Sequence, residues 1–180
     1  NATPLAESIS VVITGAGLTA PSHGTITTDG TKITYTPSAN YNGTDTFDYY
    51  CSDGDTQTKA TVSVTIHQVN DNPVANTNIV STDEDTVSVA VDVLANDTDI
   101  DIGSVLNAEV SHARSTFTVT AATLTNSDHG SVSIVDNKLV FTPALNWFGT
   151  EVVNYTMSDG HGGTASSTLT VTVNPVNDVP

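Results

Sequence analysis

The segment FDYYCSDG at residues 47–54 returns as VNYTMSDG at residues 153–160, an offset of 106 residues. In both copies an apolar side chain stands at every second position and is followed by the same Ser-Asp-Gly. Strict alternation of apolar and polar residues before a turn signal predicts a half-buried antiparallel strand. The two segments are therefore expected to be the same strand of a repeated unit.

Other motifs keep the same register along the chain. They are His23-Gly24 with His129-Gly130, Thr36-Pro37 with Thr142-Pro143, Asn40–Thr44 with Asn146–Thr150, and, at an offset of 107, Val69–Asp71 with Val176–Asp178. Such self-similarity identifies two copies of one unit. We expect one domain at 1–72 and a second at 73–180, joined at Asn70-Asp71-Asn72-Pro73, where proline stiffens the chain. The counterpart of residues 81–101 falls before Asn1, so the first domain is expected to lack its N-terminal strands.

Composition limits the kind of partner. The 180 residues include 20 acidic and 4 basic side chains, for a formal net charge of −16. This balance argues against nucleic acid, which needs clustered Lys and Arg, and against direct contact with an anionic membrane. A single cysteine excludes an intrachain disulfide framework and a Cys-based zinc site. No apolar run approaches the length of a membrane-spanning helix.

Alternating runs of β-branched residues predict the fold class. They include Val87–Val93, Val62–Ile66 and Leu169–Val173, each with an apolar residue at every second position. Short alternating runs bounded by Asp-Gly, Asn-Gly and Pro favour antiparallel strands, and no segment shows a helical stripe. About seven such strands in roughly 105 residues are typical of an immunoglobulin-like sandwich. The sequence therefore predicts an all-β protein made of tandem β-sandwich domains.

Several motifs resemble those of cadherins. Asn70-Asp71-Asn72-Pro73 resembles the cadherin linker, Asp83-Glu84-Asp85 stands where cadherins carry Pro-Glu-Asn, and Asn96–Asp99 resembles their Asp-Ala-Asp. Ser158-Asp159-Gly160 resembles their Asp-x-Gly. The whole pattern is similar to the bacterial cadherin-like tandem repeat, end to end over Thr82–Asp178 and in its second half over His23–Pro73.

This resemblance implies an extracellular protein of the bacterial cell surface. Such repeats occur in large type I-secreted, RTX-type adhesins, where they hold ligand-binding domains away from the cell and support adhesion and biofilm formation. The resemblance thus implies non-enzymatic extender repeats, stiffened by calcium, whose partners are neighbouring repeats of the same polypeptide. A cell-surface ligand and self-association stay open as further partners.

The resemblance also implies which side chains hold Ca²⁺, a hard cation that takes six to eight oxygen ligands. One site is implied at Asn70, Asn72, Asp97, Asp99 and Asp159, with Asp101 as a further candidate ligand, and Asp71 would face the other two ions of the cadherin arrangement. The carboxylates that two further cadherin ions need are not matched, so one ion is expected here. Glu84 and Asp178 are expected to form half of a second site at the other end of the domain. The alternative is that these Asp and Asn residues only form turns.

Other functions remain as alternatives. The stretch 111–123 exceeds the repeat pattern and either carries a glycan or protein ligand or, through Phe117 and Val119, lengthens a strand. Missing strands would leave open sheet edges, to which a neighbouring chain could add a strand and so build a filament; the simpler explanation is that the chain is a piece of a longer one. His23 and His129 are expected to form turns rather than bind ligands, and no catalytic set is supported. Tyr41 and Trp147 share a repeat position, which favours packing over a sugar-binding face.

Overall fold

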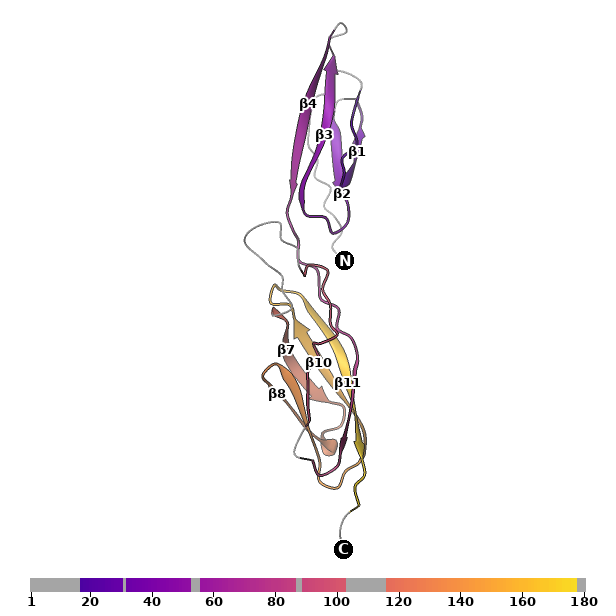
Figure 1. The fold of residues 1–180 in the computed structure, drawn as a ribbon, viewed down its shortest axis with the longest axis vertical. Coiled ribbons are helices and arrows are strands. Elements are labelled where there is room, and N and C mark those ends of the chain that lie inside the picture. The colour runs from indigo at the N-terminus through magenta and orange to yellow at the C-terminus, as the bar shows by residue number, and fades with distance from the viewer. Residues whose placement is uncertain (1–16, 31, 53–55, 87–88, 103–115, 178–180) are drawn as a thin grey trace. The chain divides into compact units, whose positions relative to one another are not determined.

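The computed structural model describes residues 17–30, 32–52, 56–86, 89–102 and 116–177. These residues divide into two compact units, one ending at Val69 and one beginning at Asn70. Both are built of β-strands with turns between them (Figure 1). We call them the first unit and the second unit and describe each by itself.

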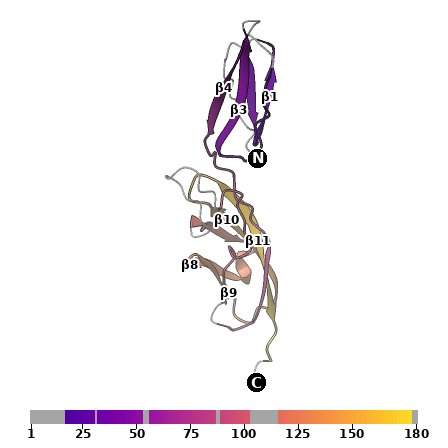
Figure 2. The same cartoon turned by 45° about the horizontal axis from the view of Figure 1, so that its top comes forward.

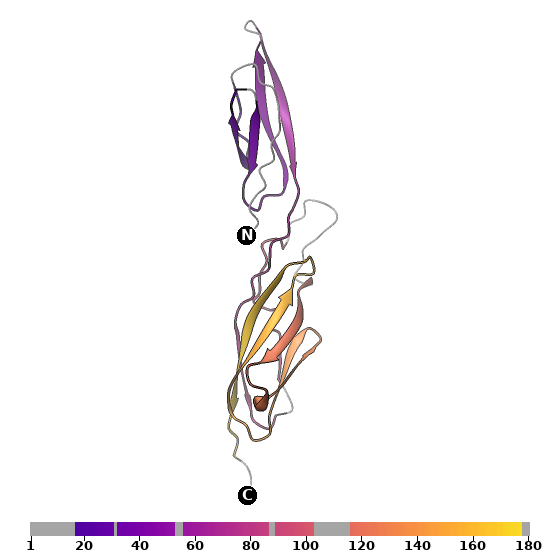
Figure 3. The ribbon, with the colours of Figure 1, turned by 180° about the vertical axis from the view of Figure 1, so that it is seen from behind.

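The second unit contains two antiparallel-rich sheets. Its four-stranded sheet has the spatial order β5-β11-β10-β7, and its three-stranded sheet has the order β6-β9-β8. The strands are β5 (Asn78–Asp83), β6 (Val89–Val91), β7 (Thr118–Leu124), β8 (Gly130–Val135), β9 (Lys138–Pro143), β10 (Gly149–Ser158) and β11 (Thr164–Asn174). Only the β5–β11 pair is parallel among these described strands. Figure 3 shows β11, β10 and β7 side by side in the larger sheet.

The core of the second unit lies between these sheets. In β10 the side chains of Val153, Tyr155 and Met157 are buried, while the residues between them are more exposed. Leu139 and Phe141 of β9 meet them from the other sheet, and both are fully buried. Burying one such side chain contributes about 1.5–3 kcal/mol. The period-two pattern thus separates a core face from a solvent face, and the prediction of all-β sandwich domains is confirmed.

One predicted strand ends before its alternating pattern does. Of the run Val87–Val93, the structure describes residues from 89 onward, and β6 ends at Val91. Val93 lies in the turn that follows, yet its side chain is completely buried. The reason is that β6 pairs with only three residues of β9, after which the backbone turns and carries Val93 into the core. Alternation here predicted the burial of Val93 correctly and placed the end of the strand too late.

The additional stretch 111–123 contributes a strand where it is described. Thr118–Leu124 forms β7, paired with β10 on the edge of the larger sheet. Phe117 and Val119 are buried in the core. The side chain of Asn137 holds this segment, because it accepts a hydrogen bond from Val119 N (2.7 Å) and donates one to Phe117 O (2.8 Å). This geometry favours the strand-lengthening interpretation; residues 111–115 lie outside the described part.

The first unit repeats the second half of this architecture. It contains β1 (Gly24–Thr28), β2 (Ile33–Pro37), β3 (Gly43–Ser52) and β4 (Gln57–Ile66), paired β1–β2 and β3–β4 (Figure 2). Ile33, Tyr35, Phe47, Val64 and Ile66 form its core. These strands correspond to β8–β11, as the offset of 106 predicts. Leu18 bridges to Tyr49, so the chain before β1 also pairs with β3 among the described residues. The side chain of Cys51 lies outside the described part.

Candidate metal centre

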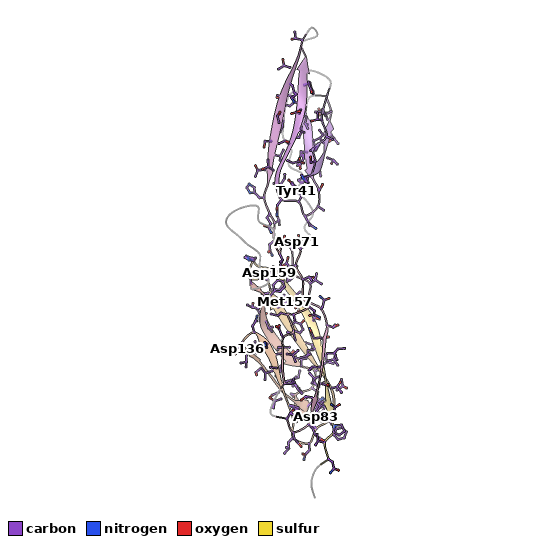
Figure 4. The ribbon with its side chains drawn as sticks, in the orientation of Figure 1. Tyr41, Asp71, Asp83, Asp136, Met157 and Asp159 are labelled. Atoms are coloured by element: carbon purple, nitrogen blue, oxygen red, sulfur yellow. The ribbon has the colours of Figure 1, made fainter. Side chains whose placement is uncertain are left out.

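Seven of the nine predicted ligands lie at one end of the second unit. Three sequence segments meet there: the linker from Asn70 to Asn72, the turn from Asp97 to Asp101, and the connection between β10 and β11 that begins with Asp159. Figure 4 labels Asp71 and Asp159 at this end and Asp83 at the opposite end of the same unit. Hydrogen bonds join the three segments, from Asn70 to Asp159 and from Asp71 to Asp101, so residues far apart in sequence share this end of the unit.

Asp159 is the most firmly held of these carboxylates. It is 1% exposed, and its Oδ1 accepts hydrogen bonds from the backbone N of His161 (2.7 Å) and of Gly163 (3.0 Å). Its Oδ2 accepts one from Asn70 Nδ2 at 2.8 Å. Burial raises the pKa of Asp159, but the hydrogen bonds from Asn70, His161 and Gly163 outweigh it and leave the pKa below its usual value. Asp159 therefore carries its negative charge at neutral pH inside the protein.

The other carboxylates are tied to the linker and to one another. Asp101, which is buried, accepts a hydrogen bond from Asp71 N at its Oδ2 (2.7 Å) and donates its own backbone N–H to Asp99 Oδ1 (2.8 Å). Asp97 is 0% exposed and accepts a hydrogen bond from Asn76 N at 2.7 Å. Three buried carboxylates, those of Asp97, Asp101 and Asp159, thus lie at one end of a domain. Charges of one sign at low dielectric repel unless a cation compensates them.

The oxygen atoms at this end suit a hard cation. Asn70 Oδ1 and Asp99 Oδ2 are completely buried, and neither accepts a hydrogen bond within the described structure. A buried oxygen without a donor costs free energy, which a bound cation would recover. Carboxylate and amide oxygens are the ligands that Ca²⁺ takes. The donor set therefore fits calcium, and Asn70, Asn72, Asp97, Asp99, Asp101 and Asp159 are the residues that could hold it.

The carboxylates are not converged on a single point. Across the described ranges, no three His, Cys, Asp or Glu side chains are gathered as a ready-made metal site. The amide of Asn70 and the backbone N–H of Asp71 occupy oxygens of Asp159 and Asp101. A cation would compete with these N–H groups for the same oxygens. Rotating the side-chain amide of Asn70 would place its oxygen where its nitrogen now donates to Asp159 Oδ2, so that this oxygen could bind a cation.

Gly163 makes room for this arrangement. A Cβ atom at this position would overlap Asp159 Oδ2 and come within 3.0 Å of Asn70 Nδ2. Gly163→Ala is therefore expected to push Asp159 away from Asn70 and to lower the free energy of unfolding of the second unit by about 1–3 kcal/mol, as overpacking does. Urea unfolding of the full chain measures the effect. Thr172→Ala, on the exposed side of β11, is the matched control and should change it by less than about 0.5 kcal/mol. Equal stability of the two variants would contradict the prediction.

Glu84 lies with Asp83 at the opposite end of the second unit, apart from the residues above. Glu84 is 6% exposed, and its Oε1 accepts a hydrogen bond from Val176 N at 2.7 Å. Its own backbone N–H donates to Asn174 O at 2.9 Å. The expected pairing of Glu84 with Asp178 stays a prediction, since Asp178 lies outside the described residues. The structure does bring Glu84 beside the strand exit that leads toward it.

Sequence reasoning missed a buried carboxylate in each unit. Glu151 is 1% exposed, and its Oε1 accepts hydrogen bonds from Thr125 N (2.7 Å), Thr125 Oγ1 (2.8 Å) and Asn126 N (3.0 Å). Its Oε2 lies 2.6 Å from Nδ1 of His129. Burial raises the pKa of Glu151, but the hydrogen bonds from Asn126, Thr125 and His129 outweigh it, and the pKa lies below its usual value.

Asp45 is the counterpart of Glu151 in the first unit. It is 3% exposed and accepts hydrogen bonds from Ser22 N (3.0 Å), His23 N (2.8 Å) and Tyr35 Oη (2.9 Å). Burial raises its pKa, but these bonds prevail and lower it. The signal in the sequence was an acidic residue at the same repeat position, in phase with the buried residues of its strand. Both carboxylates fasten the chain that enters the first strand of a hairpin.

The two turn histidines stack on the aromatic residues that share a repeat position. The ring centroids of His129 and Trp147 are 4.3 Å apart, and those of His23 and Tyr41 are 4.1 Å apart. His129 ends the short 3-10 turn η2 (Ser127–His129), as expected for a turn former, but its ring also pairs with Glu151. This stacking favours packing over a sugar-binding role for the aromatic pair.

The fold and these domain ends define a class: all-β proteins built of cadherin-like and immunoglobulin-like domains. Residues 70–175 match the family model of the bacterial cadherin-like domain, and residues 2–67 match that of the bacterial Ig domain. The first match covers more than half of the chain, and the chain therefore belongs to the family of bacterial cadherin-like domains. No protein of curated description matches it.

Solved structures agree on the fold. The chain is similar to human protocadherin-24 EC1-2, with 16% identity over 89% of this chain and 81% of that chain and a TM-score of 0.57. It is also similar to mouse protocadherin-24 EC1-3, with 15% identity over 93% of this chain and 57% of that chain and a TM-score of 0.52. It also matches, at a TM-score of 0.36, the endo-fucoidan hydrolase MfFcnA4 of glycoside hydrolase family 107 (18% identity, 97% of this chain and 27% of that chain). The chain spans about a third or less of several chains it matches.

Family membership gives the general functional setting. Bacterial cadherin-like and Ig-like domains are typical of extracellular surface proteins, are generally non-enzymatic, and the cadherin-like ones generally bind calcium. Within the described ranges, no helix has the length and apolarity needed to cross a membrane.

Proposed function

We propose that this chain is a pair of non-enzymatic extender repeats of a bacterial cell-surface adhesin, and that Ca²⁺ binds at the linker end of the second unit. The repeats hold other domains of the parent polypeptide away from the cell, in the manner of RTX-type adhesins that support adhesion and biofilm formation. Their partners are the neighbouring repeats. The family and the extracellular setting support this function, together with the buried hydrophobic core of each unit.

The observation that carries the proposal is the set of buried oxygens at the linker end. Asp97, Asp101 and Asp159 are buried carboxylates, and Asn70 Oδ1 and Asp99 Oδ2 are buried oxygens without a hydrogen bond. A domain that needed no cation would be more stable with these positions apolar or paired. The held charge of Asp159 supplies the attraction for a divalent ion, and amide and carboxylate oxygens around it supply the ligands.

Calorimetric titration of the full chain with Ca²⁺ tests this proposal. We expect one ion per chain at this end, with a dissociation constant on the order of 10⁻⁴–10⁻³ M or tighter, the range of extracellular calcium modules. Asp159→Asn should weaken binding at least about tenfold, because it removes a charge from the centre of the ligand set. Asp92→Asn, an exposed acidic position of the same unit, removes the same charge elsewhere and should leave the affinity within about twofold.

Two results would contradict the proposal. One is the absence of calcium heat at millimolar Ca²⁺. The other is equal loss of affinity in Asp159→Asn and Asp92→Asn, which would mean that Ca²⁺ responds to the net charge of −16 rather than to a built site.

A further inference from the structure

Exposed apolar side chains lie at the end of the second unit opposite the candidate metal centre. Leu145 and Phe148, in the turn between β9 and β10, are 82% and 59% exposed, and Val176, which follows β11, is 46% exposed. We call these three side chains the apolar tip. Single exposed apolar residues are ordinary on a protein surface, but several gathered at one place indicate a contact site.

Hydrogen bonds bring the two segments of the apolar tip to the same place. Asp85 Oδ1 accepts from Asn146 N at 3.1 Å, which ties the β9–β10 turn to the turn that follows β5. Glu84 Oε1 accepts from Val176 N at 2.7 Å, which ties the chain that leaves β11 to that same turn. Both segments are therefore held by consecutive residues of one turn.

The β9–β10 turn has a fixed backbone of its own. Trp147 N donates to Ala144 O at 3.1 Å, and Ala144 N donates to His129 O at 3.0 Å. The Trp147 ring stacks on that of His129 and packs against the core. Trp147 thus anchors the turn, while Leu145 and Phe148 on either side of it are exposed. A surface that is already ordered costs little conformational entropy when a partner binds.

The charges around the apolar tip are negative. Asp83, Asp85 and Asp128 are exposed there, and Figure 4 shows Asp83 at this end of the unit. In the described part of the second unit, the only Lys or Arg is Lys138, which begins β9, whereas the tip follows the other end of that strand. A negative rim attracts a cationic partner. It repels an anionic membrane and a second copy of this chain, whose net charge is −16.

The fold itself does not require the apolar tip. At the offset of 106 residues, Leu145 and Phe148 correspond to Ala39 and Asn42 in the first unit. The first unit forms the equivalent turn all the same, with Tyr41 stacked on the turn histidine. The two large apolar side chains are therefore an addition of the second unit, and their exposure is not a by-product of forming the turn.

From the exposure, the ordered turn and the negative rim, we propose that the apolar tip is a docking site for a basic peptide segment of another protein. That segment carries aromatic or aliphatic side chains beside Lys or Arg. Its apolar side chains cover Leu145 and Phe148, and its cations face Asp83 and Asp85. This binding role adds to the extender function and is independent of calcium at the linker end.

Fluorescence anisotropy of labelled peptides, mixed with the full chain in chelator, tests the proposal. The probe is an octapeptide that alternates lysine with leucine and phenylalanine, and two matched peptides carry serine or glutamate in place of lysine. The lysine peptide should bind with a dissociation constant of about 1 mM or tighter. It should bind at least about tenfold more tightly than the serine peptide, and the glutamate peptide should bind most weakly.

Variants of the full chain place the binding. Leu145→Ser combined with Phe148→Ser keeps every charge and should weaken binding of the lysine peptide at least about tenfold, because it removes the apolar centre of the contact. Ile134→Ser combined with Val135→Ser, at the far end of β8, is the matched control, since both side chains are exposed and apolar. It should leave the affinity within about twofold, as expected for a surface change away from the contact.

Four results would overturn the proposal. The first is no binding of the lysine peptide at about 1 mM, and the second is equal affinity for the lysine and serine peptides. The third is equal affinity of the parent chain and the tip variant, which would mean that the peptide responds only to the net charge of −16. The fourth is a dimer in light scattering that the tip variant abolishes, which would assign the tip to a second copy. Because the measurements are made in chelator, their failure leaves the calcium proposal untouched.

Discussion

Calcium at 100 times its dissociation constant should raise the melting temperature of the second unit by about 10–20 °C. The physical reason is mass action: an ion bound only by the folded domain adds about 2.7 kcal/mol at that concentration. For a domain of this size each kcal/mol shifts the midpoint by about 4–8 °C. Differential scanning calorimetry of the full chain in chelator and in Ca²⁺ measures the shift. Two transitions are expected, one for each unit.

The internal control is the first unit, which supplies none of the proposed ligands. Its transition should move by less than about 2 °C when Ca²⁺ is added. Mg²⁺ at the same concentration should shift the second unit far less, because it demands a smaller octahedral shell and gives up its water reluctantly. Superimposed curves in chelator and in Ca²⁺, or an equal shift of both transitions, would contradict a site built from Asn70, Asp97, Asp99 and Asp159.

Replacing Glu151 with alanine should strongly destabilise the second unit. Glu151→Ala removes a buried carboxylate that accepts bonds from Thr125, Asn126 and His129, and it leaves their N–H groups without an acceptor. Breaking a buried, hydrogen-bonded charge in this way costs about 3–5 kcal/mol. Urea unfolding of the full chain should show this loss in the second unit, with the first unit unchanged.

Glu151→Gln separates the charge of Glu151 from its shape. The amide oxygen can still accept from Thr125 and Asn126, so we expect a smaller loss, about 1–2 kcal/mol. Asp128→Asn, an exposed position of the neighbouring turn, is the control and should change stability by less than about 0.5 kcal/mol. If Glu151→Ala costs no more than Asp128→Asn, the carboxylate does not hold the turn.

The same carboxylate predicts how stability depends on pH. The folded-state pKa of Glu151 is lowered, so its contribution is fully present above the unfolded-state pKa, about 4.3, and is lost as the pH falls through the folded-state value. The folded-state pKa of Asp45 in the first unit is lowered as well. Glu151→Gln should therefore flatten the acid limb of the second unit's stability curve and leave that of the first unit intact. If the stability of the second unit falls as steeply with decreasing pH in Glu151→Gln as in the parent chain, the predicted role of the Glu151 carboxylate is wrong.

Local pattern predicted the fold well because burial in a sandwich follows a period of two. Val153, Tyr155 and Met157 alternate in the sequence and alternate into the core, and their first-unit counterpart Phe47 does the same. The end of a strand was harder to predict than its buried face, since β6 ends at Val91 while Val93 is still buried. Where a strand ends depends on how many partners its neighbour offers, which alternation alone does not encode.

The candidate site was predicted from the resemblance of short acidic motifs. Which residues belong to the site was harder to predict than where the site lies. Asp97, Asp99 and Asp159 do share one end of a domain with the linker. Their hydrogen-bond partners were not readable from the sequence, because Asn70 and Asp159 are 89 residues apart. The role of Glu151 was not predicted. Its position alternates in register with the buried residues of its strand, but an acidic residue at such a position can also be interpreted as an interruption of the apolar pattern.

The acidic excess shows what each level of information decided. The sequence by itself determined that the chain is all-β, repeated at 106 residues, and rich in carboxylates at motif positions, because alternation and register are properties of neighbouring residues. Only the tertiary structure decided which carboxylates are buried, that the linker belongs to the second unit, and that Asp45 and Glu151 fasten turns rather than face solvent. Burial and hydrogen bonding between distant segments exist only after the strands have packed, and they set which charges a cation can reach.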